Sequence, residues 1–129
     1  MSTHSIIIID DNEIDLELLA NIVSDIPDTL IKKFQSSTEA LQFLSLTQNQ
    51  AIDLVLCDFE MPQLNGLDTL IAFRKMNKHT PFMFITAHAT IERARDCKKQ
   101  GAVGFIVKPY TSYDLLSKVE KLLAPNTTQ

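Results

Sequence analysis

Five short apolar runs, separated by segments with helical periodicity, limit this chain to few folds. The runs cover residues 5–9, 30–34, 53–57, 81–85 and 103–107. Each has the length and the β-branched or aromatic content of a β-strand. The segments between them repeat apolar residues every three or four positions, as amphipathic helices do. Regular alternation of strand and helix predicts a doubly wound α/β fold, in which helices cover both faces of a five-stranded parallel sheet.

The helical segments carry their own start and stop signals. Ser36 and Glu39 have the spacing of a capping box at the start of the second helix. Gly101 is placed to stop the fourth helix. Pro62 fixes its own φ angle and Gly66 can take a positive φ angle, which suits a rigid turn before the third helix. The stripe that we expect the first helix to turn toward the sheet consists of Ile14, Leu18, Leu19, Ile22 and Val23.

Length and composition describe one ordinary globular domain. The chain has 129 residues and a net charge of −4, so we expect a single domain with a core over residues 5–124 and a short polar tail at 125–129. The acidic balance gives no general reason to bind nucleic acid or an anionic membrane. No apolar run approaches the roughly 20 residues that span a bilayer, and no signal peptide is recognisable, so we expect a cytoplasmic protein. Cys57 and Cys97 form no metal-binding or disulfide pattern, and we interpret both as free thiols.

Chemically active side chains follow four of the five predicted strands. Asp10 and Asp11 come after the first strand, Asp58 after the third, Thr86 after the fourth and Lys108 after the fifth. The second strand ends in neutral residues, which suggests that it lies at the margin of the sheet. Each of these residues alone has an ordinary interpretation as a helix cap, a turn former or a surface charge. Together they are expected at one sheet edge, where open α/β sheets bind ligands.

Three carboxylates at one edge need a partner of opposite charge. Two of them about 4 Å apart repel by about 4 kcal/mol at an effective dielectric constant near 20. An all-oxygen set without an imidazole or thiolate favours a hard cation such as Mg²⁺. A hard cation, a carboxylate nucleophile and an ammonium group suit phosphoryl transfer. We therefore predict that Asp58 holds a phosphoryl group whose oxygens are bound by Mg²⁺, Lys108 and Thr86.

Four motifs then carry a family resemblance over residues 5–124. They are IIIIDD, LVLCDFEMPQLNG, FITA and GAVGFIVKP, in that order. Together they resemble the receiver domains of two-component response regulators, typified by the chemotaxis response regulator. The resemblance implies the strand order 2-1-3-4-5. It also implies Mg²⁺-dependent transfer of a phosphoryl group to Asp58 from a sensor histidine kinase, a histidine phosphotransfer protein or a small phosphodonor.

The resemblance also implies a role for each metal-site residue. Asp11 and Asp58 correspond to direct ligands of Mg²⁺, and Asp10 to a ligand that acts mainly through water. The position of Glu60 corresponds to one that supplies its backbone carbonyl. Lys108 precedes a proline, and in the family this peptide bond is commonly cis.

Switching residues are implied in the same way. Thr86 and Phe105 correspond to the pair that rearranges when phosphate is bound. Glu60 and His88 correspond to variable positions that flank the route of the hydrolytic water, and we hypothesise that they set the lifetime of the phosphoryl group. The fourth helix, with the last strand and the last helix, is expected to form the output surface. It would act on a downstream protein partner or on a missing C-terminal output domain.

Three other functions stay open on the sequence alone. Asp58, Phe59 and Glu60 faintly match the nucleophile motif of haloacid-dehalogenase phosphatases. A flavodoxin-like module that binds FMN would share the topology, although two acids after the first strand would repel the FMN phosphate. A receiver domain used as a phosphorylation-independent interaction module is the third alternative.

Overall fold

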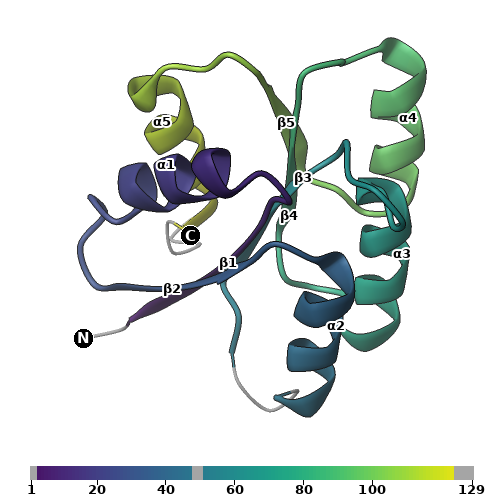
Figure 1. Ribbon diagram of the computed structural model, residues 1–129, viewed down its shortest axis with the longest axis horizontal. Helices are drawn as coiled ribbons and strands as arrows, with labels where there is room; N and C mark the ends of the chain where they lie inside the picture. Colours follow the sequence, from purple (N-terminus) through teal and green to yellow (C-terminus); the bar gives the residue numbers. More distant parts are fainter. Residues whose placement is uncertain (1–2, 48–50, 124–129) are drawn as a thin grey trace, which may run out of the picture.

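The computed structural model describes residues 3–47 and 51–123, so the predicted tail at 125–129 lies outside the described residues. Within this part of the chain, five parallel strands form one sheet in the order β2-β1-β3-β4-β5 (Figure 1). The strands are β1 (His4–Ile9), β2 (Thr29–Phe34), β3 (Leu54–Asp58), β4 (Phe82–Thr86) and β5 (Gly104–Val107). The predicted order and the marginal position of β2 are confirmed.

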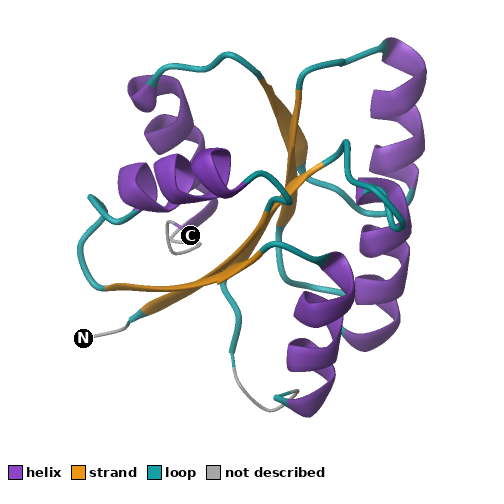
Figure 2. Cartoon of the chain, in the orientation of Figure 1, coloured by secondary structure: helices purple, strands orange, loops and turns teal. Residues whose placement is uncertain are grey.

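Helices cover both faces of the sheet, as the alternation of strand and helix predicts (Figure 2). One face is covered by α1 and α5, and the other by α2, α3 and α4 (Figure 1). The helices are α1 (Glu13–Val23), α2 (Ser37–Leu46), α3 (Gly66–Met76), α4 (Ile91–Lys99) and α5 (Ser112–Leu123). The fold is the predicted doubly wound α/β arrangement.

The isoleucines of β1 divide between the two faces because successive side chains of a strand point in opposite directions. Ile6 and Ile8 pack in the core beneath α1 and α5, whereas Ile7 and Ile9 pack beneath α2 and α3. Every residue of β3 and β4 is buried. The central strands are therefore fixed between two apolar layers, and this fixes the positions of the residues at their carboxyl ends.

Polar side chains cap the starts of the helices, and one of these caps, that of α2, was predicted from the sequence. The Ser36 hydroxyl accepts a hydrogen bond from the Glu39 N–H at 3.2 Å, which confirms the predicted start of α2. Thr111 caps α5 through the Asp114 N–H at 3.0 Å. Gly101 follows the end of α4 with a φ angle of 100°, a conformation that favours glycine. These caps satisfy backbone groups that helix ends leave without partners.

Two local expectations were wrong. Ile14 and Leu18 do not face the core, since 73% and 52% of their surfaces are exposed. The core-facing side of α1 instead consists of Leu16, Leu19, Ala20 and Val23. Gly66 does not use a positive φ angle, because it lies in the first turn of α3. It is required for space: a Cβ atom there would lie 2.9 Å from Phe59 Cα and against the Phe84 ring.

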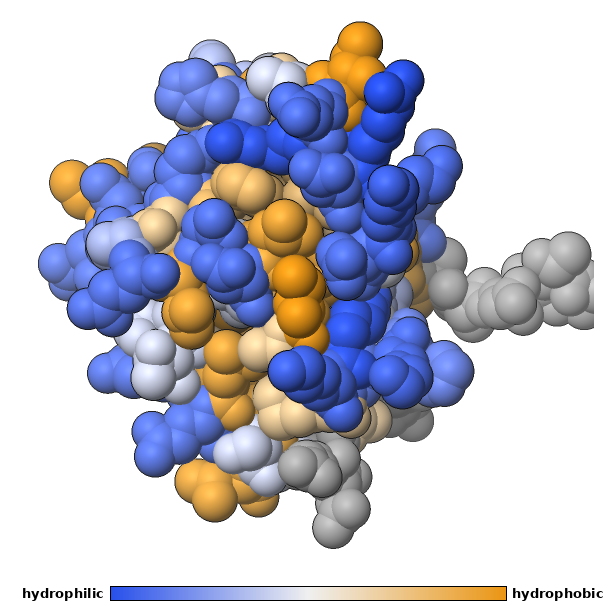
Figure 3. Space-filling model, turned by 90° about the vertical axis from the view of Figure 1, so that its right-hand side faces the viewer, coloured by the Kyte–Doolittle hydropathy of each residue, from blue (hydrophilic) through white to orange (hydrophobic). Residues whose placement is uncertain are grey.

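The part of the surface seen in Figure 3 is mostly hydrophilic, as expected from the composition of a globular domain. Among the described residues, no helix combines the length and apolar content needed to cross a membrane. On the side where α3 and α4 lie, most of the surface is hydrophilic and apolar residues gather toward the middle (Figure 3). Cys57 and Cys97 are buried free thiols, as expected.

Candidate functional site

The carboxyl ends of β1 and β3 bring three predicted acids together. Asp10 follows β1, and Asp58 is the last residue of β3. Asp10 is 1% exposed and Asp58 is 5% exposed, whereas Asp11 is an exposed residue. Oxygens of the three carboxylates all lie within 4.8 Å of one another. The predicted acidic cluster is present, and two of its members are buried.

Lys108 reaches this cluster from the end of β5. Its N–H donates to the carbonyl of Thr86 at 2.8 Å, and its peptide bond to Pro109 is cis, as the resemblance implied. The Nζ atom lies 3.7 Å from Asp10 Oδ2 and 3.5 Å from Asp58 Oδ1. Its nearest carboxylate is that of Asp15 in the first turn of α1, at 3.3 Å. The ammonium group therefore lies among three acids, one of which the sequence did not predict.

Burial and mutual repulsion make the acids less acidic than usual. Burial is the main cause that raises the pKa of Asp58 from 3.8 to about 6, the negative charge of Asp10 adds to it, and Lys108 opposes it. Burial also raises the pKa of Asp10, although the N–H of Asn12 donates to its Oδ1 at 2.9 Å and opposes the shift. Burial would lower the pKa of Lys108, but the surrounding carboxylates raise it overall. The carboxylates of the site therefore outnumber the single ammonium group of Lys108, and their negative charge is not fully compensated.

The donor set fits a hard divalent cation. Asp58 Oδ1 is buried and has no well-formed hydrogen bond from the described residues, and the Lys108 ammonium at 3.5 Å compensates its charge only in part. A buried carboxylate oxygen without a donor is costly unless a charge or donor compensates it. The three clustered carboxylates offer only oxygen ligands, which Mg²⁺ prefers. The residues therefore have the chemistry and the unsatisfied charge that a magnesium ion would neutralise.

Thr86 and the two predicted tuning residues form a separate network beside the acids. The fully buried Thr86 hydroxyl donates to Glu60 Oε2 at 2.7 Å and accepts from the His88 N–H at 3.0 Å. The exposed His88 ring lies with Nδ1 3.7 Å from the same Glu60 oxygen. Burial would raise the pKa of Glu60, but hydrogen bonds from Thr86, the Ala87 N–H and Arg93 lower it overall. In this structure, the Glu60 carboxylate accepts the one hydrogen bond that the Thr86 hydroxyl can donate.

Phe105 lies on β5, facing the α3 and α4 side of the sheet. Its half-buried ring stacks on Phe84 of β4, with ring centroids 5.7 Å apart. It packs against the same apolar cluster as Cys57, which occupies the core beneath α2 and α3. The predicted switch pair therefore lies on neighbouring strands, β4 and β5.

The structure adds Asp15 and Arg93 to the predicted residues. Asp15 contacts Lys108, and Arg93 of α4 donates to the Glu60 carboxylate. Both residues lie in the first turn of a helix. Asp15 had a weak signal, because it lies in the first turn of the helix that directly follows Asp10 and Asp11, where an acidic side chain is favoured. Arg93 had no signal beyond its place one turn after the N-cap Thr90.

The sequence model of the response regulator receiver domain matches residues 6–120 of the chain. The chain belongs to this family. The match covers nearly all described residues, and receiver domains are signalling switches, so the family assignment favours this interpretation over the phosphatase and flavin-binding alternatives.

Relatives of this receiver domain include short and long proteins. The chemotaxis protein CheY of Pseudomonas aeruginosa is 30% identical over 119 residues, which are 91% of this chain and 94% of that protein. The transcriptional regulatory protein ZraR of Escherichia coli is 35% identical over 83 residues, or 64% of this chain. The match spans only 19% of the length of ZraR.

Solved structures share the receiver fold. A response regulator receiver domain protein from Clostridium thermocellum is 28% identical, with a TM-score of 0.83, and the match covers 93% of this chain and 94% of that one. The CheX–CheY–BeF₃–Mg²⁺ complex from Borrelia burgdorferi contains a chain with a TM-score of 0.85 and 24% identity, and the match covers 94% of this chain and 90% of that one. At this identity, the second likeness concerns the fold alone.

Proposed function

We propose that this receiver domain is a Mg²⁺-dependent phosphoacceptor in a two-component system and that Asp58 carries the phosphoryl group. The observation that carries the proposal is the convergence of the Asp10, Asp11 and Asp58 carboxylates, within 4.8 Å of one another, beside the Lys108 ammonium. The donor is a phosphohistidine of a sensor histidine kinase or of a histidine phosphotransfer protein. The CheY of Borrelia burgdorferi, which shares the fold, was solved with Mg²⁺ and BeF₃; for this chain, the choice of ion rests on the all-oxygen donor set.

The chemistry needs a carboxylate nucleophile and compensation of negative charge. An oxygen of Asp58 forms a bond to phosphorus, the phosphorus–nitrogen bond of the phosphohistidine breaks, and its electron pair stays on the imidazole that leaves. Lys108, 3.5 Å from Asp58 Oδ1, neutralises an oxygen of the transferred group. Asp10, Asp11, Asp58 and the backbone carbonyl of Glu60 would hold Mg²⁺. When bound, this ion supplies neutralisation of charge on the acids and on the phosphoryl oxygens.

Phosphorylation is then read by the switch pair. The Thr86 hydroxyl leaves Glu60 and donates to a phosphoryl oxygen, and Phe105 changes its packing behind it. The domain catalyses only its own phosphorylation and dephosphorylation and works as a switch. The carboxylate of Glu60 and the ring of His88 lie beside Thr86, and this supports their proposed influence on the phosphoryl lifetime.

We place the output surface on α4, β5 and α5. In α4, whose residues are all described, only Cys97 is buried, so few core contacts oppose a shift of this helix. Three large apolar residues of this surface are exposed, Ile91, Val107 and Tyr113, and Val103 directly before β5 is exposed too. Their exposure supports a protein partner, or a C-terminal output domain, as the target. Amide hydrogen exchange in α4 should change on adding Mg²⁺ and beryllofluoride, and unchanged exchange would refute this placement.

Intact-mass measurement tests the central proposal. After incubation with acetyl phosphate and Mg²⁺, the protein should gain the mass of one phosphoryl group. The gain should disappear in Asp58→Asn and in the presence of a chelator. Phosphorylation of Asp58→Asn to the wild-type level would refute the assignment of the acceptor. Absence of any gain in the wild-type protein would instead favour a phosphorylation-independent interaction module.

A further inference from the structure

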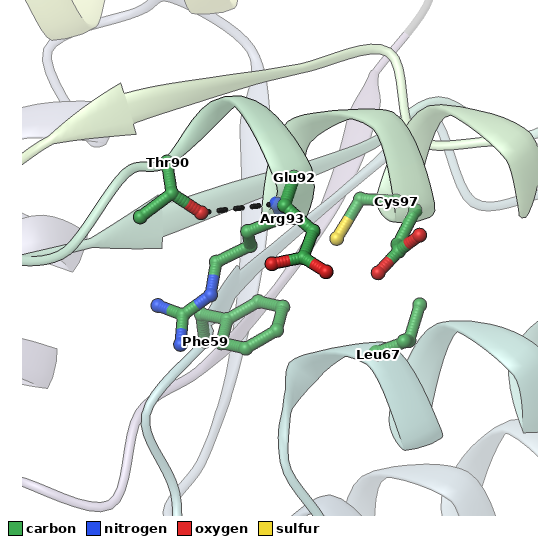
Figure 4. A pocket seen from close by; sticks show the side chains of 7 residues that line it. Phe59, Leu67, Thr90, Glu92, Arg93 and Cys97 are labelled. Atoms are coloured by element: carbon green, nitrogen blue, oxygen red, sulfur yellow. Dashed lines mark hydrogen bonds between the residues drawn. The ribbon is translucent and has the colours of Figure 1, made fainter.

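The first turn of α4 contributes a side chain that joins this helix to the phosphoacceptor segment. The N–H of Arg93 donates to the Oγ1 atom of the N-cap residue Thr90 at 3.0 Å (Figure 4). Its side chain lies over the ring of Phe59, with the guanidinium carbon 4.0 Å from the ring centroid (Figure 4). Phe59 directly follows Asp58 in the sequence. A movement of α4 would therefore disturb a contact next to the phosphoacceptor.

The Arg93 guanidinium also donates hydrogen bonds to two residues that contact Thr86, namely Glu60 and His88. Its Nη1 atom donates to the carboxylate of Glu60 and to the carbonyl of His88, the latter at 2.7 Å. The same atom lies 3.3 Å from Thr86 Oγ1. The side chains of Arg93 and Glu60 are 29% and 36% exposed, so water screens this ion pair only partly. Stacking on Phe59 orders the guanidinium and lowers the entropy cost of these bonds.

A threonine hydroxyl has one proton to donate. In this structure Thr86 donates it to Glu60 at 2.7 Å. The oxygen of the same hydroxyl faces two donors, the His88 N–H at 3.0 Å and Arg93. The hydroxyl cannot donate to a group on Asp58 until its bond to Glu60 is broken. Arg93 opposes that change because it holds the Glu60 carboxylate in place.

We propose that Arg93 is a positioning residue that latches the resting state, by holding Glu60 on the hydroxyl of Thr86. We call Arg93, Glu60 and Thr86 the α4 latch. The proposal rests on the proposed phosphoacceptor function and deepens it, since it names what the phosphoryl group must displace. A phosphoryl group on Asp58 competes for the Thr86 proton and repels the Glu60 carboxylate. Arg93 then loses its fixed acceptors, and the first turn of α4 is released.

The latch predicts that weakening the resting state strengthens binding of a phosphoryl mimic. Beryllofluoride affinity is measured at saturating Mg²⁺ from the amide resonances of Ala87 and His88. Arg93→Gln should bind beryllofluoride roughly three- to tenfold more tightly than the wild-type protein, the range for one partly buried charged contact. Arg95→Gln is the matched control, since it removes the same charge from an exposed position of α4. The control should change the affinity less than about twofold.

A second pair of proteins tests whether Arg93 acts through the hydroxyl. Thr86→Val keeps the shape of the side chain and removes its proton donor. In this background, Arg93→Gln should change the affinity less than about twofold, because nothing is left to release. An equal gain in beryllofluoride affinity with and without the hydroxyl would overturn the latch. General loosening of the loop, which does not act through Thr86, would then explain the gain. An unchanged or weaker affinity of Arg93→Gln with Thr86 intact would overturn it too.

Folding and function are separated by two further observations. If Arg93→Gln does not give a dispersed spectrum, Arg93→Lys carries the test. Lysine keeps the charge and the aliphatic stem but lacks the planar fork, so an intermediate gain is expected and no gain refutes the latch. If the wild-type protein itself fails to bind beryllofluoride with Mg²⁺, the proposed phosphoacceptor function is refuted, and the latch that rests on it is refuted as well. A wild-type protein that binds, with no gain in the variants, refutes the latch alone.

Discussion

Replacing Asp58 by asparagine should stabilise the metal-free protein at alkaline pH, although it removes the proposed phosphoacceptor. Burial, with the charge of Asp10 added, raises the pKa of Asp58 from 3.8 to about 6. This difference corresponds to about 3 kcal/mol of folding free energy that is lost when the carboxylate is charged. Asparagine has the same shape without the charge, and the ion pair with Lys108 at 3.5 Å that it gives up is already included in this pKa shift. We expect a net gain of about 1–3 kcal/mol in the free energy of unfolding near pH 8.

The sign of this effect fixes its pH dependence. The folded-state pKa of Asp58 lies above its unfolded value, so its contribution to stability is fully present below pH 3.8 and is lost as the pH rises through about 6. The advantage of asparagine should therefore grow across this window and level off above it. In acid, protonated Asp58 and asparagine are both neutral, and the two proteins should converge in stability.

Urea unfolding followed by far-ultraviolet circular dichroism measures the difference, with both proteins in a chelator across the acidic to alkaline range. Adding Mg²⁺ should stabilise the wild-type protein more than Asp58→Asn, because a ligand that binds only the folded state stabilises it. Asp11→Asn is the control: it removes one charge of the same cluster at an exposed position and should change stability by less than about 0.5 kcal/mol. The reasoning would be refuted if wild type and Asp58→Asn had equal stability at alkaline pH. It would also be refuted if their difference in the free energy of unfolding did not change with pH.

Two further substitutions test the turn after β3 and the surroundings of Thr86. Gly66→Ala should destabilise the fold by about 1–3 kcal/mol, because its Cβ atom would lie 2.9 Å from Phe59 Cα. Gly104→Ala is the control for it, since that Cβ atom would meet no described atom within 4 Å, and equal urea midpoints for both would contradict this account. His88→Ala should speed dephosphorylation roughly two- to fivefold, about 1 kcal/mol or less in activation free energy, because it opens the approach to Thr86. Loss of the phosphoryl group is followed by intact mass, and an unchanged rate would rule out the tuning role.

The strand-end residues could be predicted because a parallel sheet carries them into register. A short apolar run determines where a strand ends, and parallel pairing brings the carboxyl ends of all strands to one edge. The predicted strand at 53–57 differs from β3 (Leu54–Asp58) by one residue at each end. Strand bounds of that accuracy are enough to predict that Asp58 and Lys108 lie close together. No knowledge of helix orientation is needed for this step.

The face that α1 turns to the core could not be predicted in the same way. Apolar residues occur on two overlapping stripes of this helix, one through Ile14 and Leu18 and the other through Leu16, Leu19 and Val23. Periodicity identifies both stripes but does not choose between them. Packing makes the choice, because α1 must fit both the sheet and α5. Ile14 and Leu18 remain exposed as a result.

Asp15 and Arg93 were missed for a related reason, and it bears on how the switch works. Both approach the site from the first turn of a helix, so their positions depend on how the loop before the helix directs it. A side chain placed by the sheet keeps its position as long as the strands stay paired. One placed by a helix moves whenever that helix shifts. Asp10, Asp58 and Lys108 can therefore form a constant reaction centre, while Arg93 can respond to a change in α4. By linkage, a partner that prefers the released position of α4 must strengthen phosphoryl binding as much as phosphorylation strengthens binding of that partner.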